Sequence, residues 1–141
     1  MRERPIAAGL VVIDDVLLPR IRRHAAGAYP HECCGALIAV DGVVVEAVEL
    51  PNTTRDGARR RFLVGPDDYR LAEARARGAG GTLAGFYHSH PDHPARPSGH
   101  DLEQAWPNLI YVIVAVPQGH PREITCSVSY THLTLPTILL V

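Results

Sequence analysis

The residues best suited to chemistry lie close together in the segment 88–101, which reads HSHPDHPARPSGHD. His88 and His90 are two residues apart at the end of an expected strand, so both imidazoles leave the same face of that strand. Two neutral imidazoles and one carboxylate are a sufficient ligand set for a catalytic zinc ion, which takes three protein ligands and keeps a fourth position for water. Asp101 is the natural third ligand if the loop folds the start of the next helix back over the strand end.

A pattern of four residues at fixed spacing is stronger evidence for a metal site than a histidine pair alone. Histidine pairs in loops are usually just solvated. The pattern His-x-His-x(7)-Ser-x(2)-Asp, which ends at Ser98 and Asp101, arises by chance in roughly one chain of this size per several thousand. Ser98 and Asp101 also fit a helix-capping pattern, with Ser at the N-cap and an acid three residues later. Both roles can coexist, since the cap would hold the ligand helix in place. His93 and His100 flank the pattern and are interpreted as loop residues outside it.

Cys33 and Cys34 suggest thiol chemistry as an alternative. A nucleophilic cysteine needs a base and an electropositive setting, and the sequence assigns neither to this pair. Cys34 and Gly35 instead fit the start of a packed strand, where small residues leave room for a neighbouring site. Glu32, taken alone, is a carboxylate that follows a helix and would be solvated.

The elements expected around these residues are a mixture of strands and helices without repeats. A helix is predicted where Leu17, Ile21, Ala25 and Ala28 recur at helical spacing, and it begins close to Pro19. The dipeptide Asp-Gly at 41–42 is a strong turn signal and predicts a hairpin of strands 35–40 and 43–50. Further strands are expected at 10–13, 61–64, 82–88 and 109–116, and further helices at 66–78 and 98–106. The order β-α-β-β-β-α-β-α-β describes a mixed α/β fold rather than a doubly wound sheet.

Composition limits the classes of protein to which the chain can belong. Its 141 residues are enough for one domain with a core and too few for two ordinary ones. Hydrophobic residues make up 46% and charged residues 21%, which is close to the globular average and excludes a disordered chain. A formal charge of −1 gives no basic surface, so nucleic acid and membranes are not expected partners. Three cysteines, no apolar run of transmembrane length and no signal peptide predict a reduced, cytoplasmic protein.

Residues 128–141 differ in character from the rest of the chain. The run VSYTHLTLPTILLV contains no Asp, Glu, Lys or Arg, and its mixture of threonine and leucine occurs nowhere upstream. Its first ten residues resemble one reading frame of a common transposon-type sequencing adapter. Residues 1–127 are therefore expected to form the domain, and 128–141 to be a non-native tail that replaces the terminal strand. The alternative is a native β-tail.

The segment 88–101 resembles the signature of the JAMM (MPN-type) zinc metallopeptidases. The segment 29–35, YPHECCG, is similar to the family's Pro-x-Glu-x-Cys-Gly segment, and residues 85–87 match the lead-in to the histidine pair. The resemblance extends over about residues 10–125 and is closest to the small stand-alone bacterial members. It implies a cytidine-deaminase-like α/β fold, in which helices sandwich a mixed β-sheet.

This resemblance assigns a role to each residue of the pattern. His88, His90 and Asp101 would bind one Zn²⁺ per chain, whose charge lowers the pKa of a water in the fourth position toward neutrality. Glu32 would take a proton from that water and deliver it to the leaving amine. The Ser98 hydroxyl would point at the developing oxyanion. This mechanism has no covalent acyl-enzyme, so a nucleophilic cysteine is not required.

The resemblance to small bacterial members also implies a substrate class. The enzyme would hydrolyse the amide bond after the C-terminal Gly-Gly of a ubiquitin-like sulfur-carrier protein. Cleavage would release an amino acid such as cysteine and regenerate the carrier. The extended tail of the carrier would bind as an added strand beside the active-site groove. The enzyme itself would be a monomer or a homodimer.

Three other functions are left open. A cell-wall or phage-tail peptidase would use the same chemistry, although such family members usually carry a second hydrolase domain. A metal-free MPN domain would be a binding scaffold, but such domains typically lose the histidine pair, the Asp or the Glu, all of which this chain keeps. A Cys-Cys redox protein would lose its activity on replacement of either cysteine and would tolerate the loss of Asp101.

Overall fold

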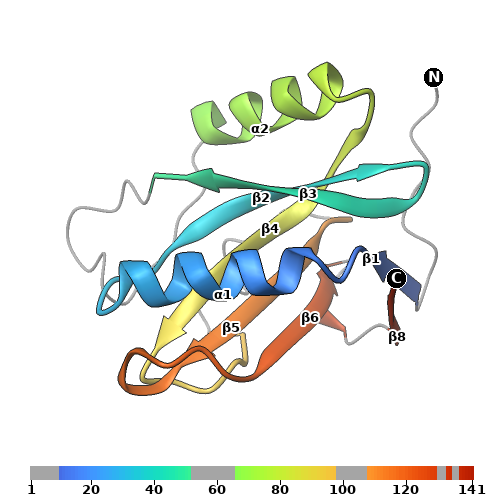
Figure 1. Ribbon diagram of the computed structural model, residues 1–141. Coiled ribbons are helices and arrows are strands. Elements are labelled where there is room, and N and C mark those ends of the chain that lie inside the picture. Colours follow the sequence, from blue (N-terminus) through green and yellow to red (C-terminus); the bar gives the residue numbers. More distant parts are fainter. Residues whose placement is uncertain (1–9, 52–65, 98–107, 130–132, 135–136) are drawn as a thin grey trace.

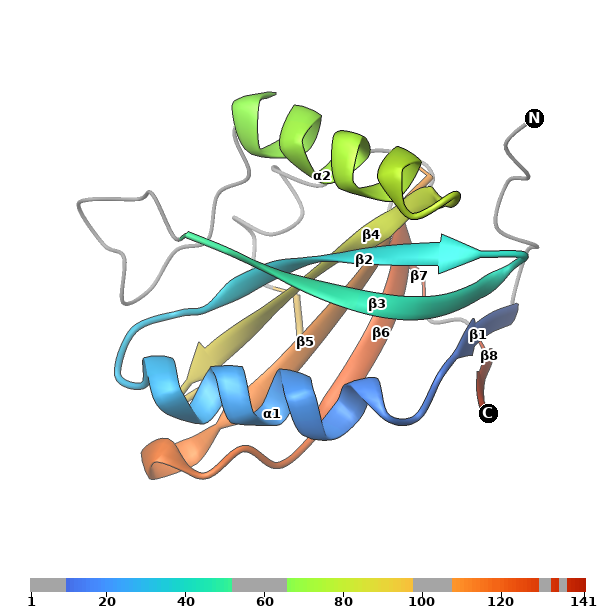
Figure 2. The ribbon, with the colours of Figure 1, turned by 45° about the horizontal axis from the view of Figure 1, so that its top comes forward.

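The computed structural model describes residues 10–51, 66–97, 108–129, 133–134 and 137–141. In this part of the chain, one mixed sheet lies between two helices, α1 (Leu17–Ala28) on one face and α2 (Pro66–Gly78) on the other (Figure 1). Figure 2 shows the twist of the sheet between them. The predicted class, a mixed α/β fold with a sheet sandwiched by helices, is therefore confirmed.

All strands of the described residues belong to this sheet. They are β1 (Leu10–Ile13), β2 (Cys34–Val40), β3 (Val43–Leu50), β4 (Thr82–Pro91), β5 (Ile110–Val116), β6 (Ile124–Ser129), β7 (Leu133–Thr134) and β8 (Thr137–Leu140). Their order across the sheet is β7-β6-β5-β4-β2-β3-β1-β8. β4 pairs antiparallel with β2 and parallel with β5. A short 3₁₀ helix, η1 (Pro117–Gly119), follows β5.

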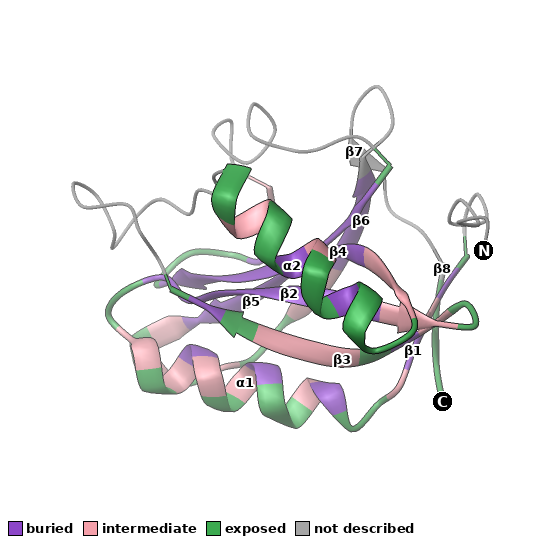
Figure 3. Cartoon of the chain, turned by 90° about the horizontal axis from the view of Figure 1, so that it is seen from above, coloured by how far each residue is buried: buried purple, intermediate pink, exposed green. Residues whose placement is uncertain are grey.

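The central strands β4 and β5 are covered on both faces. Every residue of β5 is buried, and so is the second half of β4, which explains their long apolar stretches. Leu17, Ile21 and Ala25 of α1 join the core on one face, and Ala72 of α2 joins a second cluster on the other. Figure 3 shows the buried strands between the partly exposed helices. The residues that carry the candidate chemistry therefore project from the best-packed part of the molecule.

Local signals predicted most of these elements. Asp41 and Gly42 both have positive φ angles, 52° and 82°, as a two-residue hairpin turn requires. α1 begins at Leu17, so Pro19 lies in the first turn, where its missing N–H costs no helical hydrogen bond. α2 occupies the predicted range 66–78. The predicted strand 61–64 and helix 98–106 lie outside the described residues.

The strand β6 was not predicted. Its sequence, ITCSVS, alternates apolar and small polar residues, and Ile124, Cys126 and Val128 all pack in the cluster that includes α1. This alternation was a signal for a half-buried strand.

No helix in the described residues is long and apolar enough to cross a membrane.

Residues of the expected tail form β7 and β8 at the two edges of the sheet. β8 pairs parallel with β1, from Leu10 opposite Thr137 to Ile13 opposite Leu140. Ile138, Leu139 and Leu140 remain 39–50% exposed, so β8 is held mainly through its backbone. The non-native origin of residues 128–141 stays a prediction.

Candidate active site

His88 and His90 lie side by side near the end of β4. The alternation of the strand sends both imidazoles to the same face, as predicted, and both side chains are buried. The Nε2 atoms of the two rings are 3.1 Å apart. Two nitrogens bound to one tetrahedral zinc, each about 2.0–2.1 Å from the metal, lie roughly 3.3 Å apart. The two rings therefore already have nearly the spacing that a shared metal ion requires.

Glu32 reaches this pair through the pairing of β2 with β4. Cys34 is opposite His88 in the antiparallel register, so Glu32, two residues earlier, lies level with His90 on the same face. Two further hydrogen bonds hold this end of the pairing: Ser89 N donates to Cys33 O (3.2 Å), and Cys33 N donates to Ser89 Oγ (2.8 Å). These bonds fix the backbone on which the buried Glu32 carboxylate sits.

Glu32, His88 and His90 form one group that could hold a metal ion. Each offers one ligand atom, and these atoms all lie within 4.8 Å of one another. Imidazole nitrogen and carboxylate oxygen are both ordinary ligands of zinc. A buried set of such donors fits a metal ion of this type, and solvent would not easily screen its charge.

A backbone carbonyl orients the ring of His90. Nδ1 of His90 lies 2.8 Å from Pro94 O, and because a carbonyl can only accept, Nδ1 carries the proton and donates. The neutral ring then presents the lone pair of Nε2 to the group. Metal-binding histidines commonly donate their second ring nitrogen to such a carbonyl, which fixes the tautomer and the ring plane.

A second set of hydrogen bonds holds the turn that follows His90, and the sequence did not predict it. Asp92 has a φ of 59°, and its carboxylate accepts hydrogen bonds from Tyr29 Oη (2.8 Å) and from the backbone N–H of Gln118 (2.8 Å). Asp92 thus connects the end of α1, the end of β4 and η1. The only sequence signal was an Asp in a proline-rich loop, a residue that tolerates left-handed backbone.

The remaining predicted site residues have different outcomes. Ser98, Asp101 and the flanking His100 lie outside the described residues, so their roles remain predictions. His93 is exposed, in agreement with its interpretation as a loop residue. Glu32 was predicted as a proton carrier rather than a ligand, and its position beside both imidazoles is compatible with either role.

The two neighbouring cysteines are buried and poorly suited to nucleophilic chemistry. Burial raises the pKa of Cys33 to about 11, although a hydrogen bond with Ser89 opposes this change. Burial, together with the neighbouring Cys33, raises the pKa of Cys34 to about 12. Both thiols therefore stay protonated near neutral pH, and the Cys34 thiol donates to Leu50 O (3.5 Å). The prediction that Cys34 enters a packed strand agrees with these contacts.

The sequence and the fold are similar to those of known proteins. Residues 14–128 match the family described as prokaryotic homologs of the JAB domain. The chain is 34% identical over 107 residues to the Desampylase of Haloferax volcanii, a match that covers 74% of this chain and 76% of that protein. It is 35% identical over 105 residues to Tail tip assembly protein K of Escherichia phage N15, a match that covers 74% of this chain and 40% of that protein.

The fold is also similar to that of a JAB1/MPN domain protein from Archaeoglobus fulgidus. The TM-score is 0.62 at 22% sequence identity, over 92% of this chain and 97% of that one. The family match spans both β4 with its histidine pair and the segment that carries Glu32. This chain therefore belongs to the prokaryotic JAB domain family, within the JAMM (MPN-type) metallopeptidases, and is a hydrolase.

Proposed function

We propose that this protein is a zinc-dependent peptidase or isopeptidase that cleaves the amide bond after the C-terminal Gly-Gly of a ubiquitin-like sulfur-carrier protein. The observation that carries the proposal is the buried group of Glu32, His88 and His90, with ligand atoms within 4.8 Å of one another. The resemblance of the sequence to small bacterial family members supports this substrate class. The 34% identity with the Desampylase of Haloferax volcanii also supports an enzyme that acts on another protein.

In this proposal, His88, His90 and Asp101 hold one zinc ion. When bound, zinc supplies positive charge that polarises the scissile carbonyl and makes water a better nucleophile. The hydrogen bond to Pro94 O holds the ring of His90 in place and leaves Nε2 as the nitrogen that would bind the metal. The donor set of two imidazoles and one carboxylate leaves a position for the reacting groups.

Glu32 moves the proton. Its carboxylate takes a proton from the attacking water while the oxygen–carbon bond forms, and it delivers that proton to the amine as the carbon–nitrogen bond breaks. Ser98 donates a hydrogen bond to the oxygen that gains negative charge. One carboxylate can serve as base and then as acid because the two steps follow one another.

The substrate tail is extended and ends in Gly-Gly, so we place it as an added strand beside the catalytic group. Cleavage would release an amino acid such as cysteine and return the carrier with a free C-terminus. We place this reaction in the cytoplasm of a bacterium, with the enzyme as a monomer or a homodimer.

A second candidate is a cell-wall or phage-tail peptidase, which the similarity to Tail tip assembly protein K favours. The chain spans 40% of the length of that protein. The chemistry at Glu32 and the histidine pair would be the same, and only the substrate would differ. A cell-wall stem peptide and a carrier fusion therefore separate the two candidates when they are assayed side by side.

The test combines zinc content, by mass spectrometry of purified protein, with cleavage of a carrier fusion. The wild type should hold about one zinc per chain, while His88→Ala and Asp101→Ala should lose the metal. Glu32→Gln should keep the metal and lose cleavage by roughly 10²–10⁴-fold, the usual contribution of a positioned acid or base. His93→Ala, at an exposed position next to the histidine pair, is the matched control and should change neither readout.

Three results would contradict the proposal. Near-full cleavage by Glu32→Gln would show that the proton is carried elsewhere. A folded wild type that binds no zinc when Zn²⁺ is offered would favour a non-catalytic scaffold. Cleavage of the cell-wall peptide but not the carrier fusion would favour the second candidate.

A further inference from the structure

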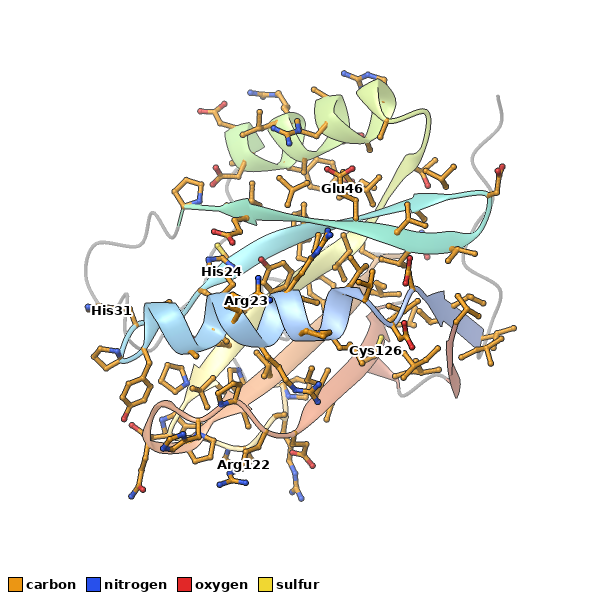
Figure 4. All side chains as sticks on the ribbon, viewed as in Figure 1. Arg23, His24, His31, Glu46, Arg122 and Cys126 are labelled. Atoms are coloured by element: carbon orange, nitrogen blue, oxygen red, sulfur yellow. The ribbon has the colours of Figure 1, made fainter. Side chains whose placement is uncertain are left out.

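A pocket of about 620 Å³ lies between α1 and β3, on the face of the sheet opposite the catalytic group. Its α1 wall includes Arg20, Arg23 and His24, and its β3 wall includes Glu49. Tyr87 of β4 also lines it, and because Tyr87 precedes His88, its side chain points to the other face of the strand. Figure 4 shows Arg23 and His24 on the side of α1 that faces β3.

Small residues keep this pocket open. Its lining includes Gly27, Ala28 and Ala47, where larger side chains would fill the space. A Cβ added at Gly27 would meet nothing within 4 Å. A glycine inside a helix lowers stability relative to alanine, so an open position at this point has a cost. The volume falls within the range of about 300–1,000 Å³ that small-molecule sites usually have.

The base of the pocket is polar and well fixed. Tyr87 is 1% exposed, and its hydroxyl lies 2.6 Å from His24 Nδ1. Burial raises the pKa of Tyr87, so the hydroxyl stays protonated and donates to His24. Nε2 of His24 then carries the ring proton and lies 3.5 Å from the carboxylate of Glu49. Three elements are thus connected by one row of polar side chains.

The charge of the pocket favours an anion. Arg20 and Arg23 are exposed at its edge, and neither guanidinium has a salt-bridge partner among the residues that the structure describes. Among the described residues that line the pocket, Glu49 is the only carboxylate, so two permanent positive charges face one negative charge. Guanidinium groups match carboxylate and phosphate oxygens with two parallel hydrogen bonds.

We propose that this pocket binds a small anionic ligand through a carboxylate or phosphate group, held by Arg20 and Arg23 above the base formed by His24 and Tyr87. The site is separate from the metal group, because the sheet lies between them. It does not depend on which substrate the catalytic face cleaves.

The test is a titration of the full-length, zinc-loaded protein with two probes, succinate and inorganic phosphate, followed by ¹H–¹⁵N NMR. Amide signals of Gly27, Ala28 and Ala47 should shift in a saturable manner with at least one probe. The probe that binds more tightly identifies the ligand as a carboxylate or a phosphate. Shifts confined to residues near His88 and His90 would indicate anion binding at the metal and would overturn the proposal.

Variants distinguish anion binding in the pocket from nonspecific attraction by positive charge. The double variant Arg20→Gln/Arg23→Gln should weaken binding by roughly tenfold or more, as expected for the loss of charge-assisted hydrogen bonds. Gly27→Phe, which fills the pocket and leaves its charges in place, should also abolish the saturable shifts. The matched control is Arg75→Gln/Arg77→Gln on α2, which removes the same charge from the other face.

Two outcomes would overturn the proposal. One is equal weakening by the α1 and α2 double variants, which would indicate nonspecific attraction. The other is the absence of saturable shifts with both probes. Cleavage and zinc content in the α1 variants should stay at wild-type values, so failure of this proposal is distinguishable from failure of the proposed function.

Discussion

Gly35 provides a direct test of how closely β2 and β4 pack on the face of the sheet that α1 covers. It lies opposite Tyr87 in the pairing of β2 with β4, and the tyrosine ring lies across it. A Cβ at Gly35 would lie 2.5 Å from the Tyr87 hydroxyl oxygen and closer still to two ring carbons. Gly35→Ala must therefore displace a ring that is buried and hydrogen-bonded to His24.

The cost of this single methyl group follows from two contributions. Overpacking a well-filled core costs about 1–3 kcal/mol, and loss of the hydrogen bond between Tyr87 and His24 adds roughly 1 kcal/mol. Together these give about 2–4 kcal/mol, so with a urea slope of about 2 kcal/mol per molar, the middle of the usual range for small proteins, the midpoint should fall by about 1–2 M. The same substitution at Gly27, where a Cβ meets nothing within 4 Å, should instead stabilise α1 by about 0.5–1 kcal/mol.

The assay is urea unfolding of Gly35→Ala, Gly27→Ala, Tyr87→Leu and the double variant Gly35→Ala/Tyr87→Leu. A shorter side chain at position 87 removes the overlap, so the cost of Gly35→Ala should shrink by at least about 1 kcal/mol in that background. An equal cost in both backgrounds would refute the steric argument. So would a shift of the same sign and size at Gly27.

Four further outcomes are expected. Asp92→Ala should cost about 2 kcal/mol in unfolding free energy and weaken zinc binding roughly 10–100-fold. Asp92→Asn keeps a hydrogen-bond acceptor and tolerates left-handed backbone, so it should lose much less of both. Urea unfolding measures the stability, and competition with a zinc chelator measures the zinc affinity. Burial lowers the pKa of His24 despite the opposing effect of Glu49, so protonation is less favourable in the folded state than in the unfolded one. Stability should therefore fall as the pH drops through and below 6.5, and less steeply in His24→Gln, as urea unfolding at several pH values would show. Removal of zinc with a chelator should lower Tm, by the equivalent of about 2.7 kcal/mol if the free metal had been at 100 times its Kd. Deletion of residues 130–141 should cost only about 1–2 kcal/mol and leave zinc content unchanged, because three strands separate β8 from β4, two separate β7 from β4, and the apolar side chains 138–140 are 39–50% exposed.

The parts of the fold that depend on local signals could be predicted from the sequence. The turn at Asp41-Gly42 and the proline and acidic residues at the start of α2 each fix their element within a few residues along the chain. The pairing of strands could not be predicted in the same way. The parallel contacts of β4 with β5 and of β1 with β8 join segments far apart in the sequence, and no local pattern specifies which edges meet.

The residues of the candidate site divide in the same way, into those that a local pattern predicts and those that depend on strand pairing or a loop. His88 and His90 could be paired from the sequence because the period of a strand alone puts them on one face. Glu32 lies far from them along the chain and joins them only through the register of β2 with β4, so the resemblance to a family supplied it and not the spacing. The contact of His90 with Pro94 O comes from a loop without periodicity, and no sequence rule predicts it.

The alternation of β4 also decides how substitutions at this site should be interpreted. His88 and His90 lie on the face of the candidate metal site, while Tyr87 and Ser89 hold the same four residues of backbone from the other side, through His24 Nδ1 and Cys33 N. A substitution at Tyr87 or Ser89 can therefore release the metal without removing any ligand. Loss of zinc identifies a ligand only when the stability of the zinc-free protein equals that of the zinc-free wild type, and a shape-conserving change such as Glu32→Gln is the direct test of a chemical role.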